Sequence, residues 1–122
     1  MRPKAAAAGG PAENATPSDA ERTPRQLITF SFYQLDPRWR FLDEAKKAKG
    51  RREWIAAVRD YQEGGTVVVP YSCVGMRADT DVLLWRIDYK LERLQAMSAA
   101  LANTGLGKYL NPIRSFLSMS KR

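Results

Sequence analysis

The 122-residue sequence contains no histidine. Histidine is the commonest general base and metal ligand in proteins and a frequent haem ligand, so its absence removes three kinds of chemistry at once. The remaining side chains form no cluster with the spacing of a metal site. We therefore assign no catalytic, cofactor-binding or metal-binding residue from the sequence.

Cysteine and long apolar runs are also scarce. The single cysteine, Cys73, cannot form an internal disulfide, which excludes a disulfide scaffold and favours a reducing compartment. No apolar run approaches the ~18 residues of a membrane span, and the first residues lack the apolar block of a signal peptide. We therefore expect a cytoplasmic protein that does not enter a membrane.

Basic residues, in contrast, are in excess, and the net charge of +7 raises nucleic acid as a partner. Between Asp43 and Glu63, however, six basic residues are mixed with five acidic ones, which is typical of a solvated helix face. The surplus is spread along the chain from Arg86 onward. Nucleic-acid binding is therefore the least favoured hypothesis.

Residues 1–26 are rich in Ala, Gly, Pro, Ser and Thr and cannot bury enough apolar area to offset the entropy of ordering. We predict a disordered tail there and one domain over residues 27–122. About 100 residues suffice for a hydrophobic core without staples.

The segment Tyr71–Ile87 organises this domain. Two apolar runs flank a five-residue connection, Gly75–Asp79, in which glycine can adopt positive φ and aspartate can bond to its own turn. This pattern predicts a β-hairpin, with Cys73 inside the first strand.

Before the hairpin, Leu27–Leu35 predicts a strand with Ile28, Phe30 and Phe32 on one face and further apolar residues on the other. Asp36-Pro37 ends it, and a short helical turn follows. A helix is predicted from Asp43 to Gln62, with Gly50 a candidate for an interruption or a kink and Gly64-Gly65 as its end. Its apolar stripe consists of Trp54, Val58 and Tyr61, with Ile55.

The hairpin itself starts from Thr66–Val69, where Pro70 indicates an edge strand or a bulge. After the hairpin, apolar residues at helical spacing predict a helix from about Asp88 to Asn103. Alternating residues predict a last strand at Ile113–Met119.

The order β-α-β-β-α-β predicts an α+β, ferredoxin-like sandwich, in which both helices cover one face of a four-stranded antiparallel sheet. Both central strands are apolar on their two faces, so the other face also needs a cover. We expect a second sheet from another copy of the chain or from another domain, as in a dimeric α+β barrel.

Three groups of side chains are candidates for a site. Asp79 and Asp81 are the only close carboxylate pair, but turn formation explains them. Cys73 lacks a histidine to lower its pKa and is better explained as a small core residue. Five aromatic residues could line a flat cofactor site but also fit a core: Trp39, Trp54, Trp85, Phe30 and Phe32.

The hairpin sequence Tyr71-Ser-Cys-Val-Gly-Met-Arg-Ala-Asp-Thr-Asp81 resembles the amino-terminal half of the chlorite dismutase family, which shows Tyr-Ser-x-Val-Gly-x-Lys/Arg-Ala-Asp here. Three further segments are similar to that half in the same order, so the resemblance covers nearly everything after the tail: Phe32–Trp39, Leu101–Leu110 and Ser115–Ser120.

The resemblance implies haem or coproheme as cofactor and two ferredoxin-like halves packed sheet to sheet, usually in rings of five. Family members degrade chlorite or decarboxylate coproheme. Their iron-binding histidine, distal arginine or glutamine and substrate-side tyrosine belong to the second half or the connection into it, and none has a position here.

The leading hypothesis is thus a structural or assembly half of a haem-dependent oxidoreductase, inactive alone. Its expected partner is a haem-bearing second half or another copy of the chain in a homo-oligomer. The alternative is a stand-alone dimeric α+β barrel that binds a small planar or apolar ligand.

Overall fold

The computed structural model describes residues 25–120. Within them, four strands and two long helices alternate with two short 3-10 helices. In chain order these are β1 (Leu27–Leu35), η3 (Pro37–Phe41), α1 (Glu44–Glu63), β2 (Val67–Ser72), β3 (Val82–Asp88), α2 (Leu91–Ala102), η4 (Gly107–Tyr109) and β4 (Leu110–Met119).

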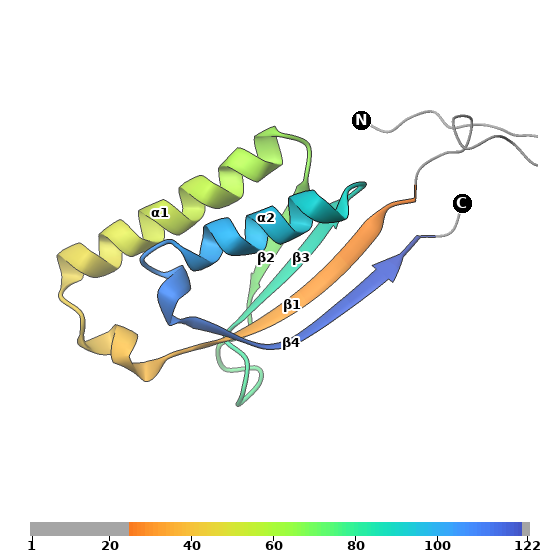
Figure 1. The fold of residues 1–122 in the computed structure, drawn as a ribbon. Coiled ribbons are helices and arrows are strands. Elements are labelled where there is room, and N and C mark those ends of the chain that lie inside the picture. The colour runs from red at the N-terminus through yellow and green to blue at the C-terminus, as the bar shows by residue number, and fades with distance from the viewer. Residues whose placement is uncertain (1–24, 121–122) are drawn as a thin grey trace, which may run out of the picture.

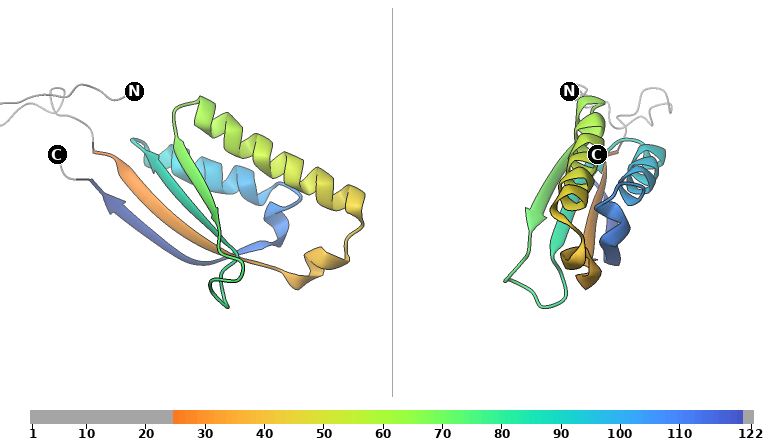
Figure 2. Two further views of the ribbon diagram at one scale, coloured as in Figure 1. Left: turned by 180° about the vertical axis from the view of Figure 1, so that it is seen from behind. Right: turned by 90° about the vertical axis from the view of Figure 1, so that its left-hand side faces the viewer.

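The strands form one antiparallel sheet in the order β2-β3-β1-β4, with β1 and β3 in the centre. Both helices lie on the same side of this sheet (Figures 1 and 2). In the middle of the sheet, Phe30 of β1 is opposite Trp85 of β3 and Phe116 of β4. This arrangement confirms the predicted ferredoxin-like fold.

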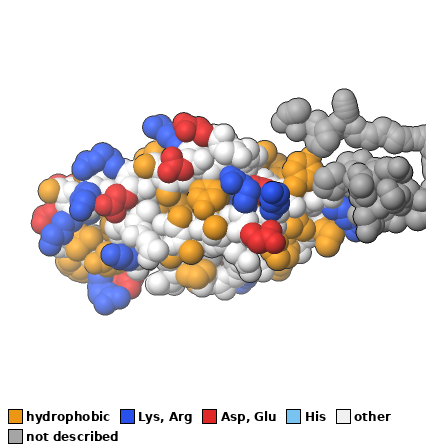
Figure 3. All heavy atoms as spheres, turned by 45° about the horizontal axis from the view of Figure 1, so that its top comes forward, with side chains coloured by type: hydrophobic (Ala, Val, Ile, Leu, Met, Phe, Trp, Pro, Cys, Tyr) orange, Lys and Arg blue, Asp and Glu red, His pale blue; other side chains and the backbone are white. Residues whose placement is uncertain are grey.

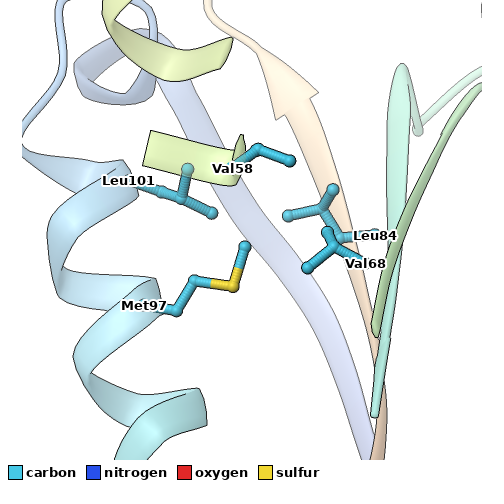
Figure 4. Packing of buried hydrophobic residues seen from close by; sticks show 5 residues of the cluster. All are labelled: Val58, Val68, Leu84, Met97 and Leu101. Atoms are coloured by element: carbon cyan, nitrogen blue, oxygen red, sulfur yellow. The ribbon is translucent and has the colours of Figure 1, made fainter. Parts of the chain in front are cut away.

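The hydrophobic core lies between the helices and the sheet. Figure 4 shows Val58 of α1 and Met97 and Leu101 of α2 facing Val68 and Leu84 of the strands. Leu84 and Met97 have no exposed surface. Because Val68 and Leu84 face the helices, their neighbours along the strands face the opposite side of the sheet.

Helix α1 begins where the sequence predicts, since the Asp43 side chain accepts a hydrogen bond from the Lys46 N–H at 2.8 Å. Gly65, with φ +108°, follows its end. The predicted interruption at Gly50 is wrong, because the helix continues through it. The assignment of Ile55 to the buried stripe is also wrong, since this residue is 43% exposed.

The connection within the hairpin is longer than the sequence predicts. Strand β2 ends at Ser72 and β3 begins at Val82, so residues 73–81 connect them, with Gly75 at φ +82°. Cys73 therefore lies just outside the strand and is half-buried rather than in the core. Pro70 occupies an edge strand, which is one of the two positions that the sequence predicts for it.

Two other boundaries differ from the prediction. Asp88 ends β3 instead of starting α2, because its side chain is held by Thr66 and Arg93. Strand β4 begins at Leu110, since pairing with β1 extends to Leu35 through a register shift. The predicted tail falls mostly on residues 1–24, outside the described residues. Within residues 25–120, neither helix is long and apolar enough for a membrane span.

Candidate functional site: the open face of the sheet

The side of the sheet opposite the helices is the candidate functional site, and we call it the open face. Residues directly opposite one another in an antiparallel sheet point to the same side, so the register identifies its members. Its apolar members are Ile28, Phe30 and Phe32 of β1, Val67, Val69 and Tyr71 of β2, Leu83, Trp85 and Ile87 of β3, and Phe116 of β4.

Aromatic rings form the centre of the open face. The rings of Phe30 and Trp85 stack with centroids 6.4 Å apart, and those of Phe32 and Phe116 meet edge to face at 6.1 Å. At the two margins Tyr71 is 48% and Phe116 is 55% exposed. A contiguous apolar surface of this kind is typical of an interaction site.

The five aromatic residues predicted as either cofactor site or core do not come together. Trp39 packs beside Tyr109 near η3, with ring centroids 5.6 Å apart, and Trp54 packs against the core from α1. The other three, Phe30, Phe32 and Trp85, share the open face. Only these three form part of the candidate site.

Asp79 and Asp81 hold the 73–81 connection in place. The Leu35 N–H donates to Asp81 Oδ2 at 2.7 Å, which fixes the connection to the end of β1. Asp79 accepts from Arg77 Nε at 3.1 Å, and this hydrogen bond lowers the pKa of the Asp79 carboxyl. Each carboxylate has its own structural partner, which agrees with the turn interpretation.

The described residues 25–120 contain no group of three histidine, cysteine or acidic side chains placed to hold a metal ion. Charge is also mixed on the helical side of the molecule, where Figure 3 shows acidic side chains interspersed among lysines and arginines. This pattern gives a nucleic-acid backbone no continuous basic stripe on that side of the described residues.

Comparison with known protein families identifies the family of this chain. The family model described as Chlorite dismutase matches residues 45–122, well over half of the chain. The chain belongs to the chlorite dismutase family. The matched region includes α1 almost entirely, the hairpin strands β2 and β3, α2 and β4. A comparison with curated proteins finds no match.

Solved structures show the same fold. Chlorite dismutase from Candidatus Nitrospira defluvii in complex with imidazole has a TM-score of 0.73 and 23% identity, over 80% of this chain and 40% of that one. A haem-binding protein from Thermus thermophilus has a TM-score of 0.69 and 24% identity, over 79% of this chain and 40% of that one. This chlorite dismutase-family chain therefore spans about 40% of the length of these structures.

The family implies haem, and the described residues do not fit a haem centre. Proteins hold haem iron through histidine, cysteine, methionine or tyrosine. The sequence has no histidine, Met97 is enclosed in the core, and Cys73 and Met76 lie in the hairpin connection. Tyr71 and Met119 are about half exposed on the two outer strands of the sheet and do not line a cavity found among the described residues. Of these residue types only Tyr33 lines the cavity beneath α2, whose volume of about 350 Å³ is at the small end for ligand sites.

Proposed function

We propose that this chain acts as the structural half of a chlorite dismutase-family haem protein, with its open face packed against a second ferredoxin-like sheet. The second half supplies the haem ligands, whether it is part of the same polypeptide or another chain. The observation that carries this proposal is the apolar open face, built mainly from three strands and centred on the aromatic rings of Phe30 and Trp85.

The size of this face supports a protein sheet as its cover. Ten mostly large apolar side chains lie on one side of the sheet. Full burial of an exposed side chain of this kind is worth about 1.5–3 kcal/mol, so covering the exposed parts of ten such side chains favours association. Arg114 and Ser118, at the β4 margin, provide a polar rim of the kind that surrounds protein interfaces.

The first experiment is to measure the mass of the purified chain by light scattering, with and without added haem. We expect a discrete oligomer through the open face that remains colourless with haem. A folded monomer unaffected by haem would overturn the covered-face proposal. Stoichiometric, coloured haem binding would show that the chain makes its own site and would overturn the assignment of haem to a second half.

A pair of matched substitutions tests which surface associates. Phe116→Lys places a charge at the 55% exposed margin of the open face, whereas Phe41→Lys makes the same change at an 86% exposed position of η3. We expect Phe116→Lys to weaken the oligomer at least tenfold in its dissociation constant and Phe41→Lys to leave it unchanged. Equal effects of the two substitutions would contradict the proposed interface.

One observation favours a second candidate function. The stacked pair Phe30 and Trp85 offers a flat aromatic surface, and a dimer would place two such pairs opposite each other. A stand-alone barrel of this kind would take up a planar ligand between its sheets. Saturable binding of a planar dye that quenches tryptophan fluorescence in the wild type but not in Trp85→Phe, without dissociating the oligomer, would favour this function.

A further inference from the structure

A cavity of about 350 Å³ lies beneath α2, on the opposite side of the sheet from the open face. It forms because β4 is the outer strand next to β1, while α2 packs over β3 (Figure 1). Leu91, Leu94 and Leu101 of α2 and Leu117 of β4 make most of its wall apolar. Its floor is polar, with Thr29 and Ser31 of β1.

Arg86 of β3 reaches this cavity and is only 3% exposed. Its Nη1 group donates to Ser98 Oγ at 3.0 Å and to the Leu94 carbonyl at 3.3 Å, and its Nη2 group donates to Ser31 Oγ at 3.1 Å. All three acceptors are neutral. Within residues 25–120, no carboxylate forms an ion pair with Arg86, although Arg93 nearby in sequence has Asp88.

Two buried polar atoms of residues that line this cavity have no hydrogen-bond partner among the described residues. They are Arg86 Nε and Thr29 Oγ1, and both belong to residues that are at least nine-tenths buried. A buried charge without a counter-charge is costly, and a buried donor without an acceptor adds to that cost. An apolar side chain of similar volume would fill a purely structural position better than this guanidinium does.

An anion would supply the partner that Arg86 lacks, and the residues of the cavity wall indicate which chemical groups the rest of this ligand would carry. A planar guanidinium pairs best with a carboxylate or phosphate, through two parallel hydrogen bonds. The leucine-lined wall favours a short apolar body over a fully hydrated inorganic ion. Thr29 can donate its hydroxyl proton to an oxygen of the same anion.

We propose that the cavity beneath α2 is a binding site for a small organic carboxylate with a short apolar body, held by Arg86 and Thr29. The proposal does not rest on the proposed assembly, because all the lining residues except Phe116 lie on the helices or on the helical side of the sheet. A failure of the open-face experiments leaves it untouched.

The test uses the full chain and three probes in isothermal titration calorimetry: hexanoate, the neutral hexanamide and acetate. We expect one saturable hexanoate site per chain, with hexanamide and acetate binding at least tenfold more weakly. The NMR signal of the Arg86 Nε–H should shift during the hexanoate titration. No saturable hexanoate binding, or equal affinity for hexanamide, would overturn the proposal.

Matched variants assign the binding to these residues. Arg86→Gln keeps hydrogen-bonding groups near Ser31 and Ser98 but removes the charge, so we expect at least a tenfold loss of affinity. Thr29→Val removes only the hydroxyl and should weaken binding severalfold. Arg59→Gln removes the same charge from an exposed position of α1 and should bind like the wild type.

Arg86→Lys controls for loss of binding that is caused by misfolding rather than by loss of the guanidinium. It keeps the positive charge but cannot make the paired hydrogen bonds, so its affinity should fall between those of the wild type and Arg86→Gln. Circular dichroism of each variant confirms that it is folded before titration. Wild-type affinity in folded Arg86→Gln would show that the guanidinium does not hold the ligand.

Discussion

Asp88 is buried at the end of β3, where it connects this strand to the start of α2 and to the residue before β2. It accepts hydrogen bonds from Thr66 Oγ1 at 2.5 Å, Arg93 Nε at 2.9 Å and the Lys90 N–H at 3.0 Å. Burial by itself would raise the pKa of the Asp88 carboxyl, but these hydrogen bonds together outweigh it and lower that pKa. The folded protein therefore favours the charged carboxylate.

This balance predicts acid-sensitive stability. The folded-state pKa of Asp88 lies below its unfolded value of about 3.9, so its stabilisation is complete above that value and is lost as pH falls through the folded pKa. At pH 7, Asp88→Asn should lower the unfolding free energy by about 1.5–3 kcal/mol, because hydrogen bonds to a charged group are lost.

Urea denaturation at pH 7 and at acid pH measures both effects. The difference between wild type and Asp88→Asn should shrink as the pH falls below about 4. A difference that stays constant over this range would mean that the charge of Asp88 does not contribute. Asp60→Asn, at an exposed position of α1, is the control and should change little.

The sequence reveals some residue roles and conceals others. Asp36, Asp43 and Gly65 are readable because capping and turn formation depend on immediate neighbours. From the sequence, Arg86 is recognised only as one of the excess basic residues. It lies two residues after the buried Leu84 and therefore on the same face of β3. The alternation of Leu84 and Arg86 is the signal in the sequence that Arg86 is buried. Only the three-dimensional structure shows that α2 covers this face of β3.

At the scale of elements, Gly50 allows α1 to pack closely against the loop that follows α2. A Cβ atom at Gly50 would lie 2.8 Å from the Leu106 nitrogen and 3.0 Å from the Trp39 ring. The helix thus approaches the loop after α2 backbone to backbone. Sequence alone predicts a kink here, because the distant segment that requires the glycine is not visible in the local pattern.

We predict that Gly50→Ala destabilises the protein despite the higher helix propensity of alanine. The propensity gain is about 1 kcal/mol, and overpacking against fixed backbone costs about 1–3 kcal/mol, so a net loss of up to about 2 kcal/mol is expected. Thermal unfolding checks this. Arg51→Ala, on the next and exposed residue, should be nearly neutral, and a stabilised Gly50→Ala protein would refute the close approach.

The order of the elements could be predicted because each has a local periodicity, and the predicted bounds of β1, Leu27–Leu35, are those of the structure. The length of the 73–81 connection could not, because it depends on Asp81 bonding to the distant Leu35 N–H. The apolar open face followed from strands that are apolar on both sides. The cavity could not be predicted from the sequence, because it depends on how much of the sheet α2 leaves uncovered.

At the scale of the whole molecule, two driving forces for association make opposite predictions. The chain carries a net charge of +7 but also an open face of apolar side chains. Association through the open face should show a negative heat-capacity change and little loss at high salt. Analytical ultracentrifugation at low and high salt, with calorimetric dilution, measures both. An oligomer that dissociates steeply with salt would indicate charge-driven assembly instead.

The antiparallel pairing of β1 with β4 brings Leu27 opposite Met119, and the Ser120 N–H donates to the Gln26 carbonyl at 2.9 Å. The first and last described residues thus leave the domain at one corner (Figure 1). A short peptide can join them without changing the register of any strand. The exposed residues 74–78 of the hairpin connection then offer new termini, so the fold is suited to circular permutation.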